Sequence, residues 1–228
     1  MLSVFSIFME TRTMSDNMPV ALLIEACSKA LDIAVKRYIK SAGPLAKRRP
    51  PESFVQHVVA EQLALVQESP VLIEEKTKDI VNNKCKKLPR NDTGRVDVAV
   101  YDNSGHPKIV IEIKIIKEIA SLNEDCKRIG ELMDLCPEIK CGIMIGYCYG
   151  KNSENLESLL NSVGKQLDTI VQEINCNSER TIAFSNEMQV EFTKPFQLDA
   201  INGRRGHFDL QGAIYLIRGA DRQSFLGS

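Results

Sequence analysis

Tryptophan is absent from this chain of 228 residues, aromatic residues make up only 6% of it, and 29 lysines and arginines almost balance 30 aspartates and glutamates. The scarcity of aromatic rings weakens any case for binding single-stranded nucleic acid by base stacking. The balanced charge excludes a protein coated in positive charge, so any nucleic-acid binding must come from a local basic patch. A run of about 18 apolar residues, the mark of a membrane-spanning helix, is also lacking.

The seven cysteines form no CxxC pair, and the three histidines lie far apart without HExxH-type spacing. An odd number of scattered thiols is typical of reduced, intracellular cysteines rather than of a disulfide framework or a zinc site. The opening segment, MLSVFSIFMETR, has no basic residue ahead of its short apolar run and no small-residue cleavage site, unlike a signal peptide. These features predict a cytoplasmic protein.

What is present has a globular composition, with 43% apolar and 26% charged residues. A chain of this length buries about 70% of its unfolded surface and forms one domain, or one domain with appendages. Apolar residues recur at helical spacing over 19–40, 51–68, 121–135 and 154–174. Strand patterns occupy 71–75, 95–102, 108–116 and 141–149, with shorter ones at 180–185, 188–193 and 212–218. This order predicts an α/β fold with a mixed central sheet flanked by helices.

The most informative segment is a predicted hairpin with the sequence RVDVAVYDNSGHPKIVIEIK, residues 95–114. If its turn is centred between Ser104 and Gly105, Asp97 faces Glu112 and a basic pair flanks them. Because side chains alternate along a strand, one face of the hairpin is then entirely valine and isoleucine, Val96 included, and the other carries the charges.

Two carboxylates on directly opposed residues, with Cβ atoms about 4.5–5.5 Å apart, repel each other, and one of them tends to keep a proton. A divalent cation removes this conflict, and Mg²⁺ favours oxygen ligands. Lys114, two residues beyond Glu112, can orient a water or offset charge on a phosphate. The alternative is a solvent-exposed charge ladder neutralised by Arg95 and Lys114. The strand at 108–116 is too apolar for an open edge, and like charges are rarely placed opposite each other.

The pattern of Asp97 followed by Glu112-Ile113-Lys114 on the next strand resembles the PD-(D/E)xK signature of restriction-endonuclease-like nucleases. Together with PESFVQ, the apolar helix after it and the turn into VIEIK, residues 50–150 resemble the nuclease domain at the N-terminus of type I restriction motor subunits. The resemblance implies a restriction-endonuclease-like αβββαβ core. The chain departs from the family at Val96, where the family has proline, and at Gln56, where many relatives have arginine.

The resemblance also implies roles for single residues. Asp97 and Glu112 would bind Mg²⁺ or Mn²⁺ together with the backbone carbonyl of Ile113, and Lys114 would position the attacking water. Glu52, which follows the helix-starting proline, would hold a second metal ion or its water.

Two alternatives stay open for the helix that carries Glu52. Glu52 can be an ordinary first-turn acid favoured by the helix dipole, and Glu61 is the fallback ligand from the same helix. The domain layout predicted on this basis has four parts: a disordered or frayed lead-in at 1–18, an N-terminal helix at 19–45, the nuclease core at 46–150, and a C-terminal α/β extension of the same domain at 151–228.

A basic stretch leads into Asp97, with seven basic residues against two acids between Lys76 and Arg95. It could draw a phosphate backbone to the metal site. The residues of this stretch that are candidates for contacting nucleic acid are Lys84, Lys86, Lys87, Arg90 and Arg95. Basic clusters at 47–49 and 204–205 are further candidates, although each alone is more often a solvated loop.

The sequence therefore predicts a Mg²⁺-dependent nuclease acting on DNA, in restriction, defence or DNA processing. No P-loop pattern occurs, so an ATP motor is not expected within it. A homodimer is a hypothesis, because cutting both strands usually needs two active sites. The rivals are a silent fold that only binds nucleic acid, a subunit that docks partner proteins of a defence system through 150–228, and a nuclease whose substrate is RNA.

Overall fold

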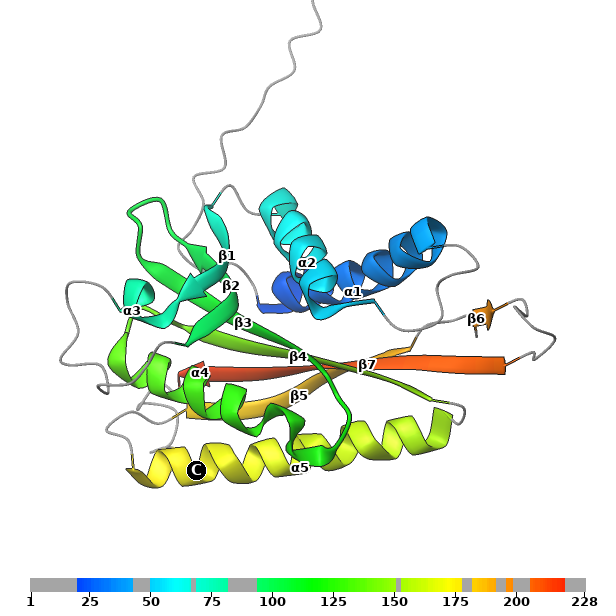
Figure 1. Ribbon diagram of the computed structural model, residues 1–228. Helices are drawn as coiled ribbons and strands as arrows, with labels where there is room; N and C mark the ends of the chain where they lie inside the picture. The colour runs from blue at the N-terminus through cyan, green and yellow to red at the C-terminus, as the bar shows by residue number, and fades with distance from the viewer. Residues whose placement is uncertain are drawn as a thin grey trace, which may run out of the picture.

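The computed structural model describes residues 20–42, 50–66, 69–81, 94–150, 153–177, 182–191, 196–198 and 206–219. The lead-in predicted at 1–18 lies outside them. Within the described part of the chain, a mixed β-sheet forms the centre and helices cover both of its faces (Figure 1). This confirms the predicted α/β class. None of the helices described is long and apolar enough to cross a membrane.

The helices are α1 (Val20–Ala42), α2 (Glu52–Val66), α3 (Thr77–Ile80), the 3₁₀ helix η2 (Ile119–Leu122), α4 (Asn123–Leu135) and α5 (Ser153–Asn177). The strands are β1 (Val71–Lys76), β2 (Arg95–Tyr101), β3 (Pro107–Ile115), β4 (Cys141–Gly150), β5 (Ile182–Glu191), β6 (Phe196–Leu198) and β7 (Gly206–Gly219). Two predicted strands, 180–185 and 188–193, are one strand, β5, interrupted only by a register shift. The sequence did not predict α3 and β6, because elements of four and three residues show no periodicity.

The sheet has the strand order β1-β2-β3-β4-β7-β5, and β6 pairs with β7 outside this path. Strands β1, β2 and β3 form an antiparallel meander, whereas β3 and β4 are parallel. A parallel pair needs a crossover connection, and α4 lies in that connection. Strand β4 is central and buried on both faces, which explains its continuous apolar sequence.

The sheet separates two hydrophobic cores. On one face, α1 and α2 pack against side chains such as Ile111 and Ile113 of β3. On the other face, α4 and α5 cover Val110 and Met144 (Figure 1). This sandwich fixes β3 between α2 and α4, so polar groups from both helices can reach the end of this strand.

The regular pleat of β2 breaks at Asp97. Val98 belongs to the core beneath α2, but Val96 belongs to the opposite core beneath α4, so the prediction that they share one face is wrong. The pairing of β2 with β3 ends at Val98↔Ile111, and β2 and β1 do not pair at the position of Asp97. On the β1 side of this gap Glu74 has φ 56°, in the left-handed region that non-glycine residues rarely adopt. Strained backbone of this kind clusters at functional sites.

Candidate active site

Asp97 fills the gap that the broken pleat leaves between β2 and β3. Its Oδ2 accepts a hydrogen bond of 2.6 Å from the backbone N–H of Ile113, and its Oδ1 accepts one of 2.6 Å from Nε2 of Gln56. The carboxylate thus accepts the N–H of Ile113 in place of a backbone carbonyl of β2. A side chain of α2, Gln56, fixes its orientation. Sequence reasoning gave Gln56 no role, and the structure makes it the side chain that orients Asp97.

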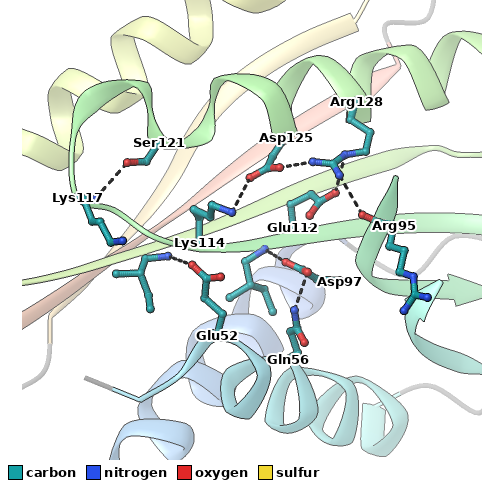
Figure 2. A network of polar contacts seen from close by, with 12 residues as sticks. Glu52, Gln56, Arg95, Asp97, Glu112, Lys114, Lys117, Ser121, Asp125 and Arg128 are labelled. Atoms are coloured by element: carbon teal, nitrogen blue, oxygen red, sulfur yellow. Dashed lines mark hydrogen bonds and ion pairs between the residues drawn. The ribbon is translucent and has the colours of Figure 1, made fainter. Parts of the chain in front are cut away.

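Glu112 lies on β3, and its side chain points toward α4 (Figure 2). The predicted register is confirmed from Val98↔Ile111 to Val100↔Ile109, but a shift between Val100 and Tyr101 pairs Tyr101 with Pro107. The register also does not extend to Asp97 and Glu112, which are therefore not directly opposed. Glu112 is only 3% exposed, which rules out a solvent-exposed ladder as its setting.

The buried carboxyl group of Glu112 lies beside the guanidinium of Arg128. Its Oε1 lies 3.3 Å from Nε of Arg128, and among the described residues neither atom has a hydrogen-bond partner. Arg128 comes from α4, so a helix distant in sequence supplies the cation that contacts Glu112. A buried acceptor that lacks a hydrogen bond is costly and rare in folded proteins.

Asp125 links the two cations of the site. Its Oδ2 is 3.8 Å from Nζ of Lys114, and its Oδ1 accepts a hydrogen bond from Nη2 of Arg128. Nη1 of Arg128 donates to the backbone carbonyl of Arg95 at 3.1 Å. Figure 2 shows the resulting row of alternating charges from Lys114 through Asp125 and Arg128 to Glu112.

Glu52 contributes from the start of α2. Its Oε1 accepts a hydrogen bond of 2.8 Å from the backbone N–H of Ile115, so it contacts β3 and does more than favour the helix dipole. The fallback, Glu61, binds Arg37 of α1 through two hydrogen bonds of 2.5 and 3.1 Å. Glu61 therefore links α2 to α1, whereas Glu52 is the acid of α2 that contacts β3.

Burial raises the pKa of Asp97 to about 6 against the opposing hydrogen bond from Ile113, and the charges of Asp125, Glu74 and Glu52 add to the rise. Such a crowded set of acids is hard to ionise completely.

Burial and then the charge of Asp97 raise the pKa of Glu112 to about 9, although Arg128 and Lys114 act in the other direction. The pKa of Asp125 is also raised, chiefly by burial. The charge of Asp97 is one of the causes of the raised pKa of Glu112, so the two carboxyl groups titrate as a coupled pair. Arg128 and Lys114, the cations that act on Glu112 among the described residues, do not bring its pKa down to the ordinary value.

The donors of the site are oxygen atoms, the kind of ligand that a hard divalent cation prefers. Across the described ranges, no three His, Cys, Asp or Glu side chains already stand together in metal-binding positions. The carboxylates nonetheless offer the oxygen atoms that Mg²⁺ prefers, one of them lacks a hydrogen bond, and an added cation would relieve the raised pKa values. The residues that would hold it are Asp97, Glu112, the carbonyl of Ile113 and Glu52.

A pocket of about 490 Å³ adjoins Glu52 and Lys114 at the end of β3. Its other lining residues are Pro51, Ile115, Lys117 and Ser121. The site is thus open on this side to a molecule from solvent.

Of the basic residues predicted to bind nucleic acid, Arg95 is described. Its side chain is half-exposed and lies 3.8 Å from the carboxylate of Glu74. The other four, Lys84, Lys86, Lys87 and Arg90, lie outside the described residues, as do the clusters at 47–49 and 204–205.

Two charged residues of α4 were missed as members of the site. Asp125 and Arg128 are three residues apart on one helix face, and Asp125 is only 8% exposed. The available signal was an acid within the apolar stripe of the helix, between Leu122 and Ile129. A buried acid in such a stripe requires a partner.

Comparison of the chain with protein-family models, with curated proteins and with solved structures finds no match. The geometry of the site is therefore the ground for assigning a function.

Proposed function

We propose that this protein is a cytoplasmic, Mg²⁺-dependent nuclease of the PD-(D/E)xK type that hydrolyses phosphodiester bonds in DNA, in restriction, defence or DNA processing. The observation that carries the proposal is the convergence of Asp97, Glu112 and Lys114 where β2 and β3 separate, with acids that the cations among the described residues leave incompletely neutralised. The succession α2-β1-β2-β3-α4-β4, broken only by the short α3 and η2, agrees with a restriction-endonuclease-like core.

Each residue has a distinct task in this proposal. Asp97, Glu112, the Ile113 carbonyl and Glu52 would bind the cation, which when bound would offset negative charge on the phosphate and favour ionisation of water. Gln56 orients Asp97 through its 2.6 Å hydrogen bond.

Lys114 is the residue proposed to act on the water and the phosphate. Its ammonium group can orient the attacking water through one hydrogen bond and stabilise charge that develops on the phosphate through another. Asp125, 3.8 Å away, keeps the ammonium directed along the row of charges. Arg128 holds the buried carboxylate of Glu112 from the α4 side.

One observation favours a second candidate, a catalytically silent fold that binds nucleic acid or a partner protein. The guanidinium of Arg128 lies 3.3 Å from Glu112, where its positive charge partly takes the place of a metal ion. The pKa of Glu112 stays raised in spite of it, so its compensation is incomplete. This residual imbalance favours the nuclease.

The proposal predicts cutting of supercoiled plasmid DNA with Mg²⁺ or Mn²⁺ and none with EDTA, followed as nicked and linear products on a gel. RNA of matched sequence, tested in parallel, decides between the two nucleic acids. Failure to cut either substrate, with DNA still bound, would move the assignment to the silent fold. If both strands are cut, sedimentation on DNA should show a dimer.

Glu52→Gln should reduce the cutting rate by about tenfold, an effect of about 1.4 kcal/mol, because it removes one negative charge from the cation site. The amide oxygen can still accept the hydrogen bond from Ile115. Glu61→Gln is the matched control, since it makes the same change on the same helix, at a residue bound to Arg37. Equal rates for the two variants would remove Glu52 from the site.

A further inference from the structure

The pocket beside the candidate active site is lined by two lysines, a serine and one acid. It lies at the end of β3, where Glu52 and Lys114 form one wall and Lys117 and Ser121 another. In Figure 2 Lys117 and Ser121 lie on the far side of Lys114 from Arg128. The pocket is therefore continuous with the site through Lys114 but distinct from the contacts of Arg128.

The hydroxyl group of Ser121 is placed to donate a hydrogen bond. Its Oγ accepts hydrogen bonds from the backbone N–H groups of Lys117, at 3.2 Å, and of Glu118, at 3.1 Å. A hydroxyl oxygen has two acceptor positions and one donor proton. Both acceptor positions are occupied, so the capacity left to the Ser121 hydroxyl is that of a donor.

The charges around the pocket favour an anion. Lys117 is exposed, and no ion pair of its ammonium group occurs among the described residues. Lys114 supplies a second ammonium group, and Glu52 is the one acid in the lining. One oxygen of that acid already accepts the N–H of Ile115. Within the lining, two cations and a hydroxyl donor thus face one partly engaged carboxylate. Outside the lining, Asp125 lies 3.8 Å from Lys114, and the carboxylate of Glu118 accepts the backbone N–H of Ser121, so Lys117 is the cation left for an anion.

From these observations we infer that the pocket is a subsite for a phosphate group of a nucleic-acid strand, bound by Lys117 and Ser121. The inference rests on the proposed function and deepens it, because it places a second phosphate next to the one at Lys114. A strand carries phosphates at short, regular intervals, so a strand bound at the site brings a second anion with it. Two sources share this chemistry, an internal phosphodiester and a terminal phosphate.

The test is binding of a DNA duplex in EDTA, where cutting plays no part. Lys117→Ala should weaken binding about fivefold and reduce the slope of log K against log salt by about 0.9, as expected for the loss of one phosphate contact. Lys117→Arg should retain both values, because it keeps the charge. The control is Lys127→Ala, which removes an exposed lysine paired with Glu124 on α4.

The outcomes separate this inference from the nuclease proposal. If wild type cuts DNA and Lys117→Ala leaves binding and its salt slope unchanged, the subsite is wrong and the nuclease stands. If no protein cuts DNA but Lys117→Ala weakens binding as expected, the subsite stands and the nuclease proposal fails.

The source of the phosphate is decided by substrate. A Lys117→Ala defect of equal size on circular plasmid and on linear duplex would assign the subsite to an internal phosphodiester. A defect found only on linear duplex with 5′-phosphate ends, and not with 5′-hydroxyl ends, would assign it to a terminal phosphate. The absence of any defect on all three substrates would overturn the inference.

Discussion

Replacing Glu112 with glutamine is expected to stabilise the metal-free protein by about 2 kcal/mol near neutral pH. The reason is that the folded chain holds this carboxyl group 3% exposed, with a pKa raised from 4.5 to about 9. Between these two values the unfolded chain releases a proton that the folded chain retains. The amide has no proton to release and can accept a hydrogen bond from Arg128.

The raised pKa values of Asp97 and Glu112 also fix how the stability of the metal-free protein depends on pH. Where the folded state binds more protons than the unfolded state, the free energy of unfolding falls as pH rises. For metal-free wild type this fall should begin with Asp97, between pH 3.8 and about 6, and continue with Glu112 up to about 9. Glu112→Gln should lose most of the slope above pH 6. Urea denaturation in EDTA at a series of pH values measures both effects.

In the presence of Mg²⁺, wild type should become more stable than Glu112→Gln. A ligand that binds only the folded state at a hundred times its Kd stabilises by about 2.7 kcal/mol, and in a chain of this size each kcal/mol raises Tm by about 2–4 °C. Wild type should gain this shift, and Glu112→Gln should gain little of it.

The control for this comparison is Glu131→Gln, at an exposed position of α4, which should behave as wild type. A Glu112→Gln variant that is less stable than wild type in EDTA would contradict the electrostatic argument. Equal gains from Mg²⁺ in both proteins would place the cation elsewhere.

Periodicity was sufficient to predict the framework. Alternating β-branched residues predicted β2 and β3, and the turn signal predicted the register that pairs Val98 with Ile111. Because that register brings the two ends of the hairpin together, Asp97 was correctly expected near Glu112. The helices on either side follow from their apolar stripes in the same way.

The local geometry of the site could not be predicted from the same rules, because it violates them. Strict alternation would put Val96 on the face of Val98, but the pleat breaks between them and Asp97 bonds to the backbone of Ile113. The contacts that compensate for the break come from helices distant in sequence. Gln56 is 41 residues from Asp97, and no local pattern links the two.

The buried charges of the site lower the stability of the fold, which points to a functional reason for the geometry. A chain selected for stability alone would not bury Glu112 with an oxygen that lacks a hydrogen bond, nor place Asp97 near it. Departures of this kind from local consistency are expected at functional sites. Arg128 reduces the cost without removing it, since the pKa of Glu112 stays raised beside it.

Lys114→Ala and Asp97→Asn should both abolish detectable cutting, with a loss of at least about 10³-fold, but for different reasons. Asp97→Asn removes a ligand charge and should also lose the stabilisation by Mg²⁺. Lys114→Ala removes the group that acts on water and phosphate, and it leaves the acids in place. Its stabilisation by Mg²⁺ should therefore persist or increase, because a competing positive charge is gone.

The test measures cutting of supercoiled plasmid and the Mg²⁺-induced shift in Tm on the same preparations. Lys108→Ala is the matched control, since Lys108 lies on the same strand as Lys114 and pairs with Asp102 at 3.0 Å. Lys114→Arg should not restore cutting, because a planar guanidinium does not reproduce a compact ammonium donor. Cutting by Lys114→Ala at the rate of Lys108→Ala would remove Lys114 from the chemistry. Loss of the Tm shift in Lys114→Ala would instead mean that the lysine serves to organise the metal ligands rather than to act on the substrate.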